Sequence, residues 1–488
     1  MPFDASADPA ETRAHRRGPL RPRHLVSARS RLGGDTLARL VQLSDLLLMA
    51  GVVGVAWLRQ GPASGLVLAA SLLVAATLVS FEAYQLSARE RLHRHIYRVI
   101  GAVGGSGLIM LTFVSLRAPE TRAHNTGQIV DWCLTIAGLL AASHLCWFLY
   151  VRQLRTRGLL TPNLLIVGAT PAAARLIDAA LRSREVNILG IFDDRGARTP
   201  RDIAGVPVLG TTASVTSHRL LPYVDRIVVT VPANAAGRIA QLLASLAPVP
   251  NAISLLVEGR DAARELAAHE RILDIPLAHL SGARRGAWQL FVKRSLDIAL
   301  SVLAVIALIP LLVILVIAIR IDSPGPALFK QRRHGYLNEE VLVWKFRSMR
   351  AGAADAHASR QVSANDDRVT RVGRFIRKTS LDELPQLWNV IRGEMSLVGP
   401  RPHAIGMLTD GAEASKLVET YAHRHRMKPG LTGWAAVNGS RGPVDTPEAV
   451  RRRVSLDLEY VERQSVWLDM AIILRTLPCV LGDAGTVR

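Results

Sequence analysis

The topology of the chain depends on the uncharged stretch Ile298–Ile319, which reads IALSVLAVIALIPLLVILVIAI. Its length suffices for a helix that crosses the hydrocarbon region of a membrane, and Asp297 and Arg320 bound it with charge. Pro310 lies near the middle, where it removes a helical hydrogen bond and can kink the segment so that both ends return to one side. We therefore predict a re-entrant membrane helix over 297–321 that breaks at Pro310, with a straight crossing as the alternative.

The composition indicates a membrane protein. Its 488 residues carry a formal net charge of +20, which requires an anionic partner such as nucleic acid, a membrane surface or a phosphorylated substrate. The hydrophobic share of 49% and the mean hydropathy of +0.21 favour a membrane, and we expect no nucleic-acid partner. The three cysteines indicate no disulfide framework.

The N-terminal part holds four more apolar segments. They lie near 38–58, 65–84, 99–116 and 129–150. Each is about as long as a membrane-spanning helix, so we predict four transmembrane helices over 37–151, preceded by a basic disordered tail over 1–36. The positive-inside rule assigns the tail, the arginine-rich connection 85–98 and everything after Arg152 to the cytoplasm.

Residues 160–282 have the pattern of a Rossmann-like α/β domain. Buried-strand runs at 163–168, 187–192 and 226–231 alternate with helical stretches, which indicates a parallel sheet. The first strand enters the turn Gly168–Ala174, which lacks the later glycines of a dinucleotide-binding fingerprint. We interpret this segment as a tight strand–helix turn and expect no catalysis in the domain.

Two adjacent carboxylates stand out in the C-terminal part, in the stretch Arg377–Asn389 that reads RKTSLDELPQLWN. Asp382 and Glu383 have basic residues on both sides, and cations beside a carboxylate keep it ionised and also hold phosphates, which favours phosphoryl transfer. The structural alternative is a capping box, in which Glu383 reaches back to the backbone N–H of Ser380. Pro385 argues against this register, because it would fall in the second turn of the helix.

The surrounding region is dense in glycine, proline and basic motifs. They are Ser323–Gln331, Val343–Met349, Asn365–Gly373, Val398–Pro402, Lys428–Gly439 and Asp457–Val461. Together with the carboxylate pair they closely resemble the bacterial sugar transferases that start exopolysaccharide and O-antigen repeat units, the polyprenyl-phosphate hexose-1-phosphate transferases. The resemblance implies a mainly α-helical monotopic catalytic domain over 290–488. Larger members of that family also carry four N-terminal membrane helices and a Rossmann-like middle domain.

The resemblance implies a role for each acid of the pair. Asp382 matches the nucleophile, which attacks the β-phosphate of a nucleoside-diphosphate sugar, releases UMP and carries the sugar phosphate until polyprenyl phosphate takes it in a ping-pong sequence. Glu383 matches the second acid, associated with the required Mg²⁺, and we expect both acids at the metal. Further matches, expected at the substrate, are Lys345, Arg347, Arg377, Pro400 and Arg401. Pro310 matches the helix-breaking proline, although Ile309 stands where the family usually has a small polar residue.

The resemblance also implies an enzyme of the bacterial inner membrane with its catalytic domain on the cytoplasmic face. We expect it to transfer hexose-1-phosphate from a UDP-sugar to undecaprenyl phosphate as the first membrane step of repeat-unit synthesis. Membrane lipids and a second copy of the chain, in a homodimer, are further expected partners. Glucose is favoured because Asn438–Gly442 and Asp445–Thr446 resemble glucose-specific members, and galactose is the alternative.

Two other functions compete with this one. A non-catalytic polysaccharide assembly scaffold would show a sustained heptad pattern, which the sequence lacks. An NAD-dependent sugar-nucleotide dehydratase or epimerase would need a Tyr-x-x-x-Lys pair, and no tyrosine of the chain has a lysine four residues on. Among the other conspicuous residues, we interpret His423–Arg426 as a solvated basic face, with nucleotide contact as the alternative, and Asp469 as structural or capping.

Overall fold

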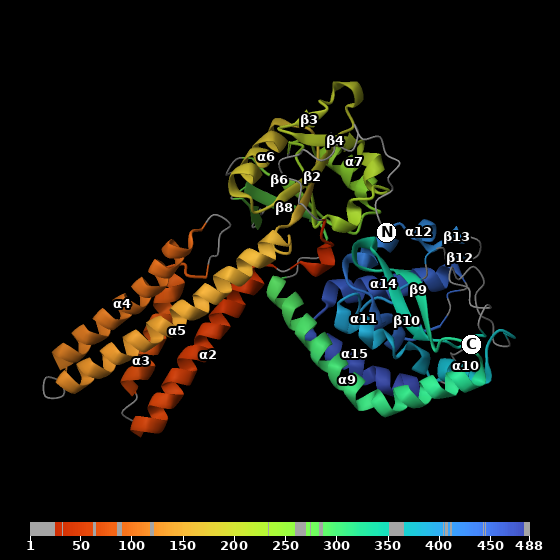
Figure 1. The fold of residues 1–488 in the computed structure, drawn as a ribbon. Helices are drawn as coiled ribbons and strands as arrows, with labels where there is room; N and C mark the ends of the chain where they lie inside the picture. The colour runs from red at the N-terminus through yellow and green to blue at the C-terminus, as the bar shows by residue number, and fades with distance from the viewer. Residues whose placement is uncertain are drawn as a thin grey trace.

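The computed structural model consists of a helical bundle, an α/β middle domain and a C-terminal domain (Figure 1). It describes residues 25–482 except 32, 62–64, 85–89, 118–121, 233, 259–269, 274, 283–285, 351–365, 404, 406–407, 410–411, 443 and 445. Most of the predicted basic tail, part of the connection 85–98, and Asp445 lie outside the described residues.

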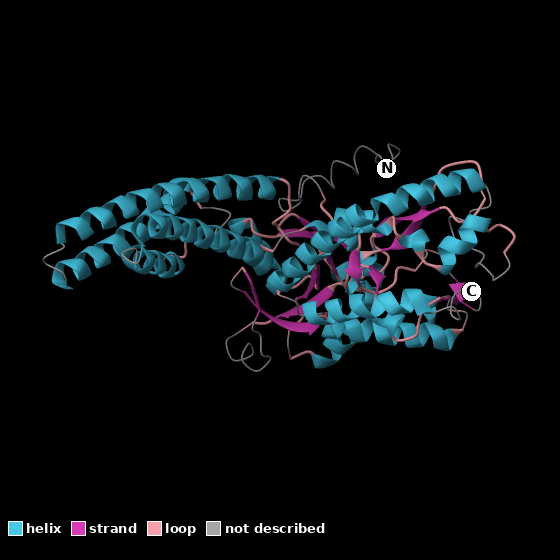
Figure 2. Ribbon diagram, turned by 90° about the horizontal axis from the view of Figure 1, so that it is seen from below, coloured by secondary structure: helices cyan, strands magenta, loops and turns pink. Residues whose placement is uncertain are grey.

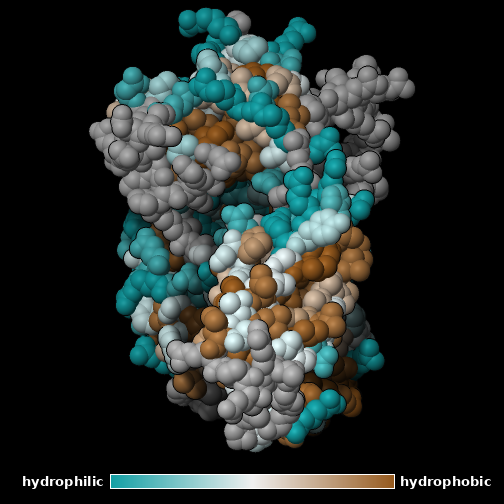
Figure 3. Space-filling view, turned by 90° about the vertical axis from the view of Figure 1, so that its left-hand side faces the viewer, coloured by the Kyte–Doolittle hydropathy of each residue, from teal (hydrophilic) through white to brown (hydrophobic). Residues whose placement is uncertain are grey.

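Four helices pack together in the N-terminal bundle, which projects from the rest of the molecule (Figures 1 and 2). They are α2 (Gly34–Gln60), α3 (Gly65–Ser80), α4 (Leu92–Arg117) and α5 (Arg122–Thr156). Apolar side chains from all four helices form one core. By length and composition, the segments that contain α2, α4 and α5 qualify as membrane-spanning helices. Figure 3 shows hydrophobic side chains gathered over the lower part of that view and hydrophilic ones at its top, over the middle domain.

Helix α3 differs from the predicted span over 65–84. It has 16 residues and ends at Ser80, and Glu82 follows with a φ of 53°, in the left-handed region. The carbonyl of Glu82 accepts a hydrogen bond from Nη1 of Arg98, which holds the turn. At 1.5 Å per residue the helix is about 24 Å long, whereas the hydrocarbon region measures about 30 Å. α3 is therefore shorter than a full crossing.

A line of buried polar side chains ties three helices of the bundle together. Oδ2 of Asp45 on α2 lies 2.9 Å from Nε2 of His144 on α5, and Nδ1 of His144 lies 2.9 Å from Nε2 of His95 on α4. All three residues are fully buried. Because a buried polar group without a partner is costly in an apolar bundle, these hydrogen bonds fix the relative positions of the helices.

Residues 25–31 and 33–36 of the predicted tail are described and include the start of α2, so the predicted disorder is wrong for these residues. Residues Ala28–Ser30 form a short 3-10 helix. Nη1 of Arg31 lies 2.7 Å from Oδ2 of Asp225 in the middle domain, and Oγ of Ser27 donates to Oε2 of Glu339 in the C-terminal domain at 2.5 Å. These contacts offset the conformational entropy that keeps an isolated arginine-rich tail disordered.

The middle domain is built on an eight-stranded sheet of order β3-β4-β2-β1-β5-β6-β8-β7. The strands are β1 (Asn163–Val167), β2 (Asn187–Phe192), β3 (Asp202–Ile203), β4 (Val206–Gly210), β5 (Arg226–Val229), β6 (Ala252–Leu256), β7 (Glu270–Ile272) and β8 (Ile275–Ser281). The central strands β4, β2, β1, β5 and β6 are parallel, and antiparallel strands complete both edges. Helices α6 (Pro171–Ser183) and α7 (Ala236–Leu246) contribute to separate hydrophobic cores on this sheet. The predicted parallel α/β arrangement is confirmed.

The C-terminal domain surrounds a two-stranded hairpin with helices. The hairpin consists of β9 (Leu328–His334) and β10 (Glu340–Phe346), which pair antiparallel. The main helices are α10 (Arg371–Lys378), α11 (Gln386–Arg392), α14 (Pro447–Arg463) and α15 (Val466–Gly482). The short strands β11 (Ser396–Val398) and β14 (Gly430–Thr432) pair in parallel between them.

Helix α9 (Ala287–Asp322) begins earlier than the predicted 297–321 and continues through Pro310. The proline therefore bends the helix instead of ending it, and the bend is plain near the middle of α9 in Figure 1. Its first half is anchored by Asp297, whose Oδ2 accepts a hydrogen bond from Oγ of Ser396 at 2.8 Å. Its end is anchored by Arg347, whose Nη2 donates to the carbonyl of Ser323 at 2.6 Å. Both halves of α9 are thus attached to the same domain.

Candidate functional site

Asp382 and Glu383 lie in the 3-10 turn η7 (Leu381–Glu383), between α10 and α11. Ser380 precedes the turn with a φ of 55° and makes no side-chain cap, so the capping-box alternative is wrong. Both Glu383 oxygens instead meet cationic side chains, because the left-handed residue turns the pair toward the β9–β10 hairpin.

Glu383 is held by two cations from different parts of the domain. Nζ of Lys345 on β10 lies 3.0 Å from its Oε1, and Nη2 of Arg401 lies 2.6 Å from the same oxygen. Nη1 of Arg401 lies 3.3 Å from Oε2, so the guanidinium grips the carboxylate in the forked geometry typical of arginine. Burial alone would raise the pKa of Glu383, but the charges of Arg401 and Lys345 outweigh it and hold the pKa well below its ordinary value.

Asp382 is adjacent to Glu383 in the chain but has a different set of contacts. Its Oδ2 lies 4.0 Å from Nζ of Lys345, and no described residue donates a hydrogen bond to its carboxylate. Burial raises the pKa of Asp382 and the neighbouring Glu383 raises it further, against the opposing charges of Lys345, Arg377 and Arg401. The pair therefore contains one carboxylate, that of Glu383, held by two cations, and one, that of Asp382, that accepts no hydrogen bond from a described residue.

Glycines allow Arg401 to approach the pair. The segment Val398–Pro402 runs beside β14, and the carbonyl of Pro400 accepts a hydrogen bond from the N–H of Gly430 at 3.0 Å. A Cβ on Gly430 would come within 2.1 Å of the backbone nitrogen of Gly399, so no side chain fits at this crossing. The predicted residue Pro400 thus acts through its backbone, by fixing the loop that presents Arg401.

The other predicted substrate residues separate into two groups. Arg377, in the last turn of α10, is near enough for its charge to act on Asp382. Arg347 does not join them, because its buried guanidinium binds the carbonyls of Ser323 and Pro324 at the end of α9, at 2.6 and 2.8 Å. The structure therefore gives Arg347 a role in anchoring the membrane helix, in place of the expected contact with substrate.

Two more arginines lie near the site: Arg333, which the sequence analysis missed, and Arg441, which it included only in the segment Asn438–Gly442 and not as a site residue. Arg333 on β9 donates from Nη1 to the carbonyl of Pro402 at 2.9 Å, and burial together with the charge of Arg401 lowers its pKa to about 10. Nη2 of Arg441 lies 2.8 Å from Oγ of Ser380, beside the acid pair. Neither arginine is adjacent to an acid in the sequence, so only the fold brings these two side chains close to the acid pair.

A buried ion pair links helices α9 and α15 of the C-terminal domain. Lys293 on α9 lies 2.8 Å from Oδ2 of Asp469 on α15, and the hydroxyl of Tyr460 donates to Oδ1 of Asp469 at 2.6 Å. The interpretation of Asp469 as structural is confirmed. The prediction of a solvated basic face over His423–Arg426 is wrong. These residues form part of the 3-10 helix η8 (Tyr421–Arg426), in which Arg424 and His425 are buried in the domain, and the half-buried His423 and Arg426 contact the middle domain.

The acid pair meets the minimum requirement for Mg²⁺. Among the described residues, no group of three or more His, Cys, Asp or Glu side chains is arranged to hold a metal ion. Mg²⁺ is commonly bound by one or two carboxylates together with substrate phosphates and water. Asp382 and Glu383 fit a Mg²⁺ ion that is completed by a diphosphate, and they do not form a protein cage.

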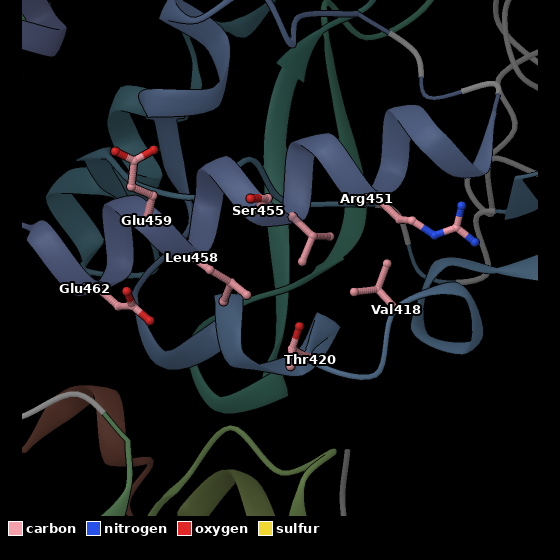
Figure 4. A pocket seen from close by; sticks show the side chains of 8 residues that line it. Val418, Thr420, Arg451, Ser455, Leu458, Glu459 and Glu462 are labelled. Carbon is pink, nitrogen blue, oxygen red and sulfur yellow. The ribbon is translucent and has the colours of Figure 1, made fainter.

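A separate depression of about 400 Å³ lies along α14 and is not part of this site (Figure 4). Figure 4 shows Glu459 and Glu462 on α14 and Thr420 on the segment facing it. Arg451 is the only cationic side chain in its lining. Two carboxylates against one guanidinium do not favour a phosphate ligand.

The chain matches two families of known proteins. Residues 288–483 match the bacterial sugar transferases, and residues 79–256 match a family described as the CoA-binding domain. A UDP-glucose:undecaprenyl-phosphate glucose-1-phosphate transferase of Xanthomonas campestris is 36% identical, over 68% of this chain and 69% of the relative. An undecaprenyl-phosphate glucose phosphotransferase of Komagataeibacter xylinus is 38% identical, over 60% of this chain and 54% of the relative.

A third relative, a UDP-glucose:undecaprenyl-phosphate glucose-1-phosphate transferase of Escherichia coli, is 46% identical over 41% of each chain. The matches thus span about two thirds of the first relative and about half or less of the other two. The segment that matches the sugar transferases contains the acid pair, Lys345, Arg401 and the bent helix α9. With this site inside the matched segment, and with an alignment over 69% of the Xanthomonas protein, the chain belongs to the family of bacterial sugar transferases.

Proposed function

We propose that this chain transfers glucose-1-phosphate from UDP-glucose to undecaprenyl phosphate and releases UMP. The observation that carries the proposal is the division of labour in the acid pair. Glu383 is fixed between Lys345 and Arg401, whereas Asp382 has no hydrogen-bond donor among the described residues. A desolvated carboxylate whose oxygens accept no hydrogen bond from a described residue, with one loose ion pair to Lys345, is a competent nucleophile toward phosphorus once a cation neutralises the target. The relatives carry the same activity in their names.

In the first step, an oxygen of the Asp382 carboxylate attacks the β-phosphorus of UDP-glucose. The bond between this phosphorus and the oxygen that bridges to the α-phosphate breaks, and UMP leaves with the electron pair. In the second step, a phosphate oxygen of undecaprenyl phosphate attacks the same phosphorus, and the Asp382 carboxylate leaves. The two displacements are balanced without any proton acceptor other than the phosphates.

Cationic side chains compensate the charge at each step. Lys345, Arg377 and Arg401 surround the carboxylates from three different elements, and each can turn toward phosphate oxygens when the diphosphate enters. Mg²⁺, held by the two acids and the diphosphate, would neutralise charge on the diphosphate and stabilise the leaving phosphate. The forked contact of Arg401 keeps Glu383 ionised and oriented for that role.

The lipid substrate requires a particular placement of α9. We propose that α9 enters and leaves the membrane on the cytoplasmic side, because Asp297 in its first half and Ser323 at its end are both bound to the same domain. Its apolar side chains, among them Ile306, Ile309 and Val313, are largely exposed and would contact lipid. The phosphate of an undecaprenyl chain that lies beside α9 would then reach the basic surface next to α10.

The test is the identity of the released nucleotide. Purified protein in detergent or nanodiscs is given UDP-glucose, undecaprenyl phosphate and Mg²⁺, and the products are separated by chromatography. We expect UMP, which requires the lipid for turnover and is absent with Asp382→Asn. Release of UDP would mean transfer of glucose without its phosphate and would contradict the proposal. A parallel reaction with UDP-galactose distinguishes the alternative sugar, because only the true donor yields UMP at a comparable rate.

A further inference from the structure

The 3-10 helix η8 (Tyr421–Arg426) lies between the middle domain and the acid pair, and its side chains point both ways. On one side, Nε2 of His423 lies 2.8 Å from the carbonyl oxygen of Ala247, which ends helix α7. Nε of Arg426 donates to the carbonyl of Pro250 at 3.1 Å, and its Nη2 lies 2.9 Å from Oγ of Ser281 at the end of β8. Both residues therefore dock the C-terminal domain on the middle domain.

Another residue of η8, Arg424, connects this contact to the active site. Arg424 is almost completely buried, and its Nη2 donates to the backbone carbonyl of Arg401 at 2.6 Å. The same guanidinium forms a buried ion pair with Asp457 on α14. The side chain of Arg401 in turn holds Glu383 with its two nitrogens. His423 and Arg426 thus bind the middle domain, and Arg424 holds the backbone of Arg401, whose side chain binds Glu383.

The docking contact is of the kind that persists at cellular pH. Burial and the charge of Arg426 lower the pKa of His423 to about 4, so the ring is neutral and donates its Nε2–H to Ala247. Ala247 is the C-cap of α7, where the helix dipole favours a hydrogen-bond donor such as His423, and Pro250 follows in the loop after the helix. The contacts described for His423 and Arg426 with the middle domain are hydrogen bonds to two backbone carbonyls and one hydroxyl.

A second clamp lies close to the first. Oγ of Ser27 binds Glu339, which follows the 3-10 helix η6 (Tyr336–Asn338) at the tip of the hairpin, and Arg31 binds Asp225 of the middle domain. His425 of η8 also contacts this tip, since its Nδ1 lies 3.2 Å from the carbonyl oxygen of Gly335. The middle domain is therefore attached to the C-terminal domain at η8 and at the end of the β9–β10 hairpin that carries Lys345.

We propose that the middle domain helps to position the active site. Its contacts with His423 and Arg426 hold η8 in place, and η8 in turn holds Arg401 and thereby Glu383. This inference rests on the proposed function, because the readout is sugar-phosphate transfer. It gives the Rossmann-like domain a role that needs no bound nucleotide. It also means that anything that separates the two domains will weaken catalysis without touching the substrates.

The experiment measures steady-state transfer per folded molecule in the full-length protein with the changes His423→Ala and Arg426→Ala, singly and together. We expect kcat to fall by about tenfold to a hundredfold in the double variant, the range observed when a remote change misplaces catalytic groups by about an ångström. The KM for UDP-glucose should change less than kcat. His423→Gln keeps an N–H donor and should restore most of the activity lost in His423→Ala. Arg451→Ala, which removes an exposed arginine paired with Glu448, is the charge-matched control and should behave like wild type.

Two readouts separate positioning from a general loss of stability. A variant that is only less stable would contain less active protein, but kcat per folded molecule would stay at the wild-type value. A variant that misplaces Arg401 should instead lose kcat per folded molecule while the KM for UDP-glucose changes less. Rescue by His423→Gln should restore kcat per folded molecule, and not only the amount of folded protein.

The outcomes distinguish this inference from the proposed function. Lipid-dependent UMP release by wild type, together with an unchanged kcat in the double variant, would overturn the positioning role alone. An activity loss that only matches the loss of folded protein would overturn it as well. If the double variant does not fold, the His423→Ala and His423→Gln pair carries the test. Absence of UMP release from wild type would instead contradict the proposed function.

Discussion

Asp193–Asp194 and Asp382–Glu383 are two pairs of adjacent acids that lie beside arginines, and they differ in how many hydrogen bonds their carboxylates accept. In the middle domain, Asp193 accepts hydrogen bonds from the N–H of Ala169 and from Arg195, and Asp194 accepts from Thr212 and Arg238. In the C-terminal domain, Glu383 is equally satisfied but Asp382 accepts none from a described residue. The difference supports our proposal that Asp382 is the reactive acid, because part of its bonding capacity is left open.

The same comparison explains the middle domain. The N–H of Ala169, in the turn after β1, is the kind of donor that a Rossmann-like domain offers to a ligand phosphate. Here the Asp193 carboxylate occupies it at 2.6 Å, and Arg195 covers Asp193. Burial opposes ionisation, but the bonds from Arg195 and Ala169 outweigh it and lower the pKa of Asp193 to about 2. The carboxylate of Asp193 therefore occupies the place in the turn after β1 where a ligand phosphate would bind.

The largest expected effect is the loss of the nucleophile. Asp382→Asn should reduce lipid-dependent UMP release at least about a thousandfold, because the amide cannot form the bond to phosphorus. The matched change Asp193→Asn should keep most of the transfer activity per folded molecule. Initial rates with both variants measure the contrast. Near-native turnover by Asp382→Asn would remove the distinction between the two acid pairs.

The next effect comes from the cation that fixes the second acid. Arg401→Ala removes both hydrogen bonds to Glu383 and leaves a buried carboxylate held by Lys345 alone. We expect kcat to fall by about a hundredfold, as for loss of one preorganised electrostatic partner. Arg401→Lys should recover only part of the rate, since a lysine cannot make the forked contact. Full recovery by lysine would show that charge alone matters there.

The pH dependence should reveal the unusual state of Asp382. Its pKa is raised, so it gains a proton at pH values where an ordinary aspartate is still ionised, and activity should fall there on the acid side. Lys345 opposes this rise, so in Lys345→Met the acid limb of kcat should move to higher pH. A profile of kcat against pH for wild type and variant measures the shift. Movement to lower pH would contradict the assignment of the limb to Asp382.

A smaller effect, on stability, is expected at the satisfied pair. Asp193→Ala leaves the N–H of Ala169 without its partner and should destabilise the middle domain by about 1–3 kcal/mol. Because the folded-state pKa of Asp193 is lowered, its contribution is complete above the ordinary range of aspartate and is lost as pH falls toward about 2. Thermal unfolding of wild type and variant should therefore differ at pH 7 and converge in strong acid. A constant difference at every pH would argue against the ionised pair.

The smallest expected effect is that of added nucleotide on the middle domain. Because Asp193 occupies the turn, coenzyme A or NAD at millimolar concentration should leave the unfolding temperature of the wild-type protein unchanged. Thermal shift assays provide the measurement. A clear upward shift with either compound would show that Arg195 and Asp193 move aside for a ligand, and it would weaken the contrast between the two pairs.

Local sequence patterns were sufficient for much of this protein. The apolar spans and the strand–helix alternation of the middle domain follow from hydrophobic periodicity, and the acid pair stands out within a short motif. Such signals are carried by residues close together in the chain, so they survive without knowledge of the fold. Lys345 and Arg401 were expected only from the resemblance to the sugar transferases. The proline of α9 was read correctly as a source of bending, although the helix continues through it.

Other features depend on residues far apart in the chain. Arg347 belongs to a motif rich in basic residues, yet packing turns it to the end of α9. His423 and Arg426 resemble a solvated basic run until the carbonyls of Ala247 and Pro250 are brought against them. Whether an acid is satisfied, as Asp193 is, or left open, as Asp382 is, depends on which donors the fold places within hydrogen-bond distance. No local pattern contains that information, because a hydrogen bond needs both partners and the chain supplies them from separate elements.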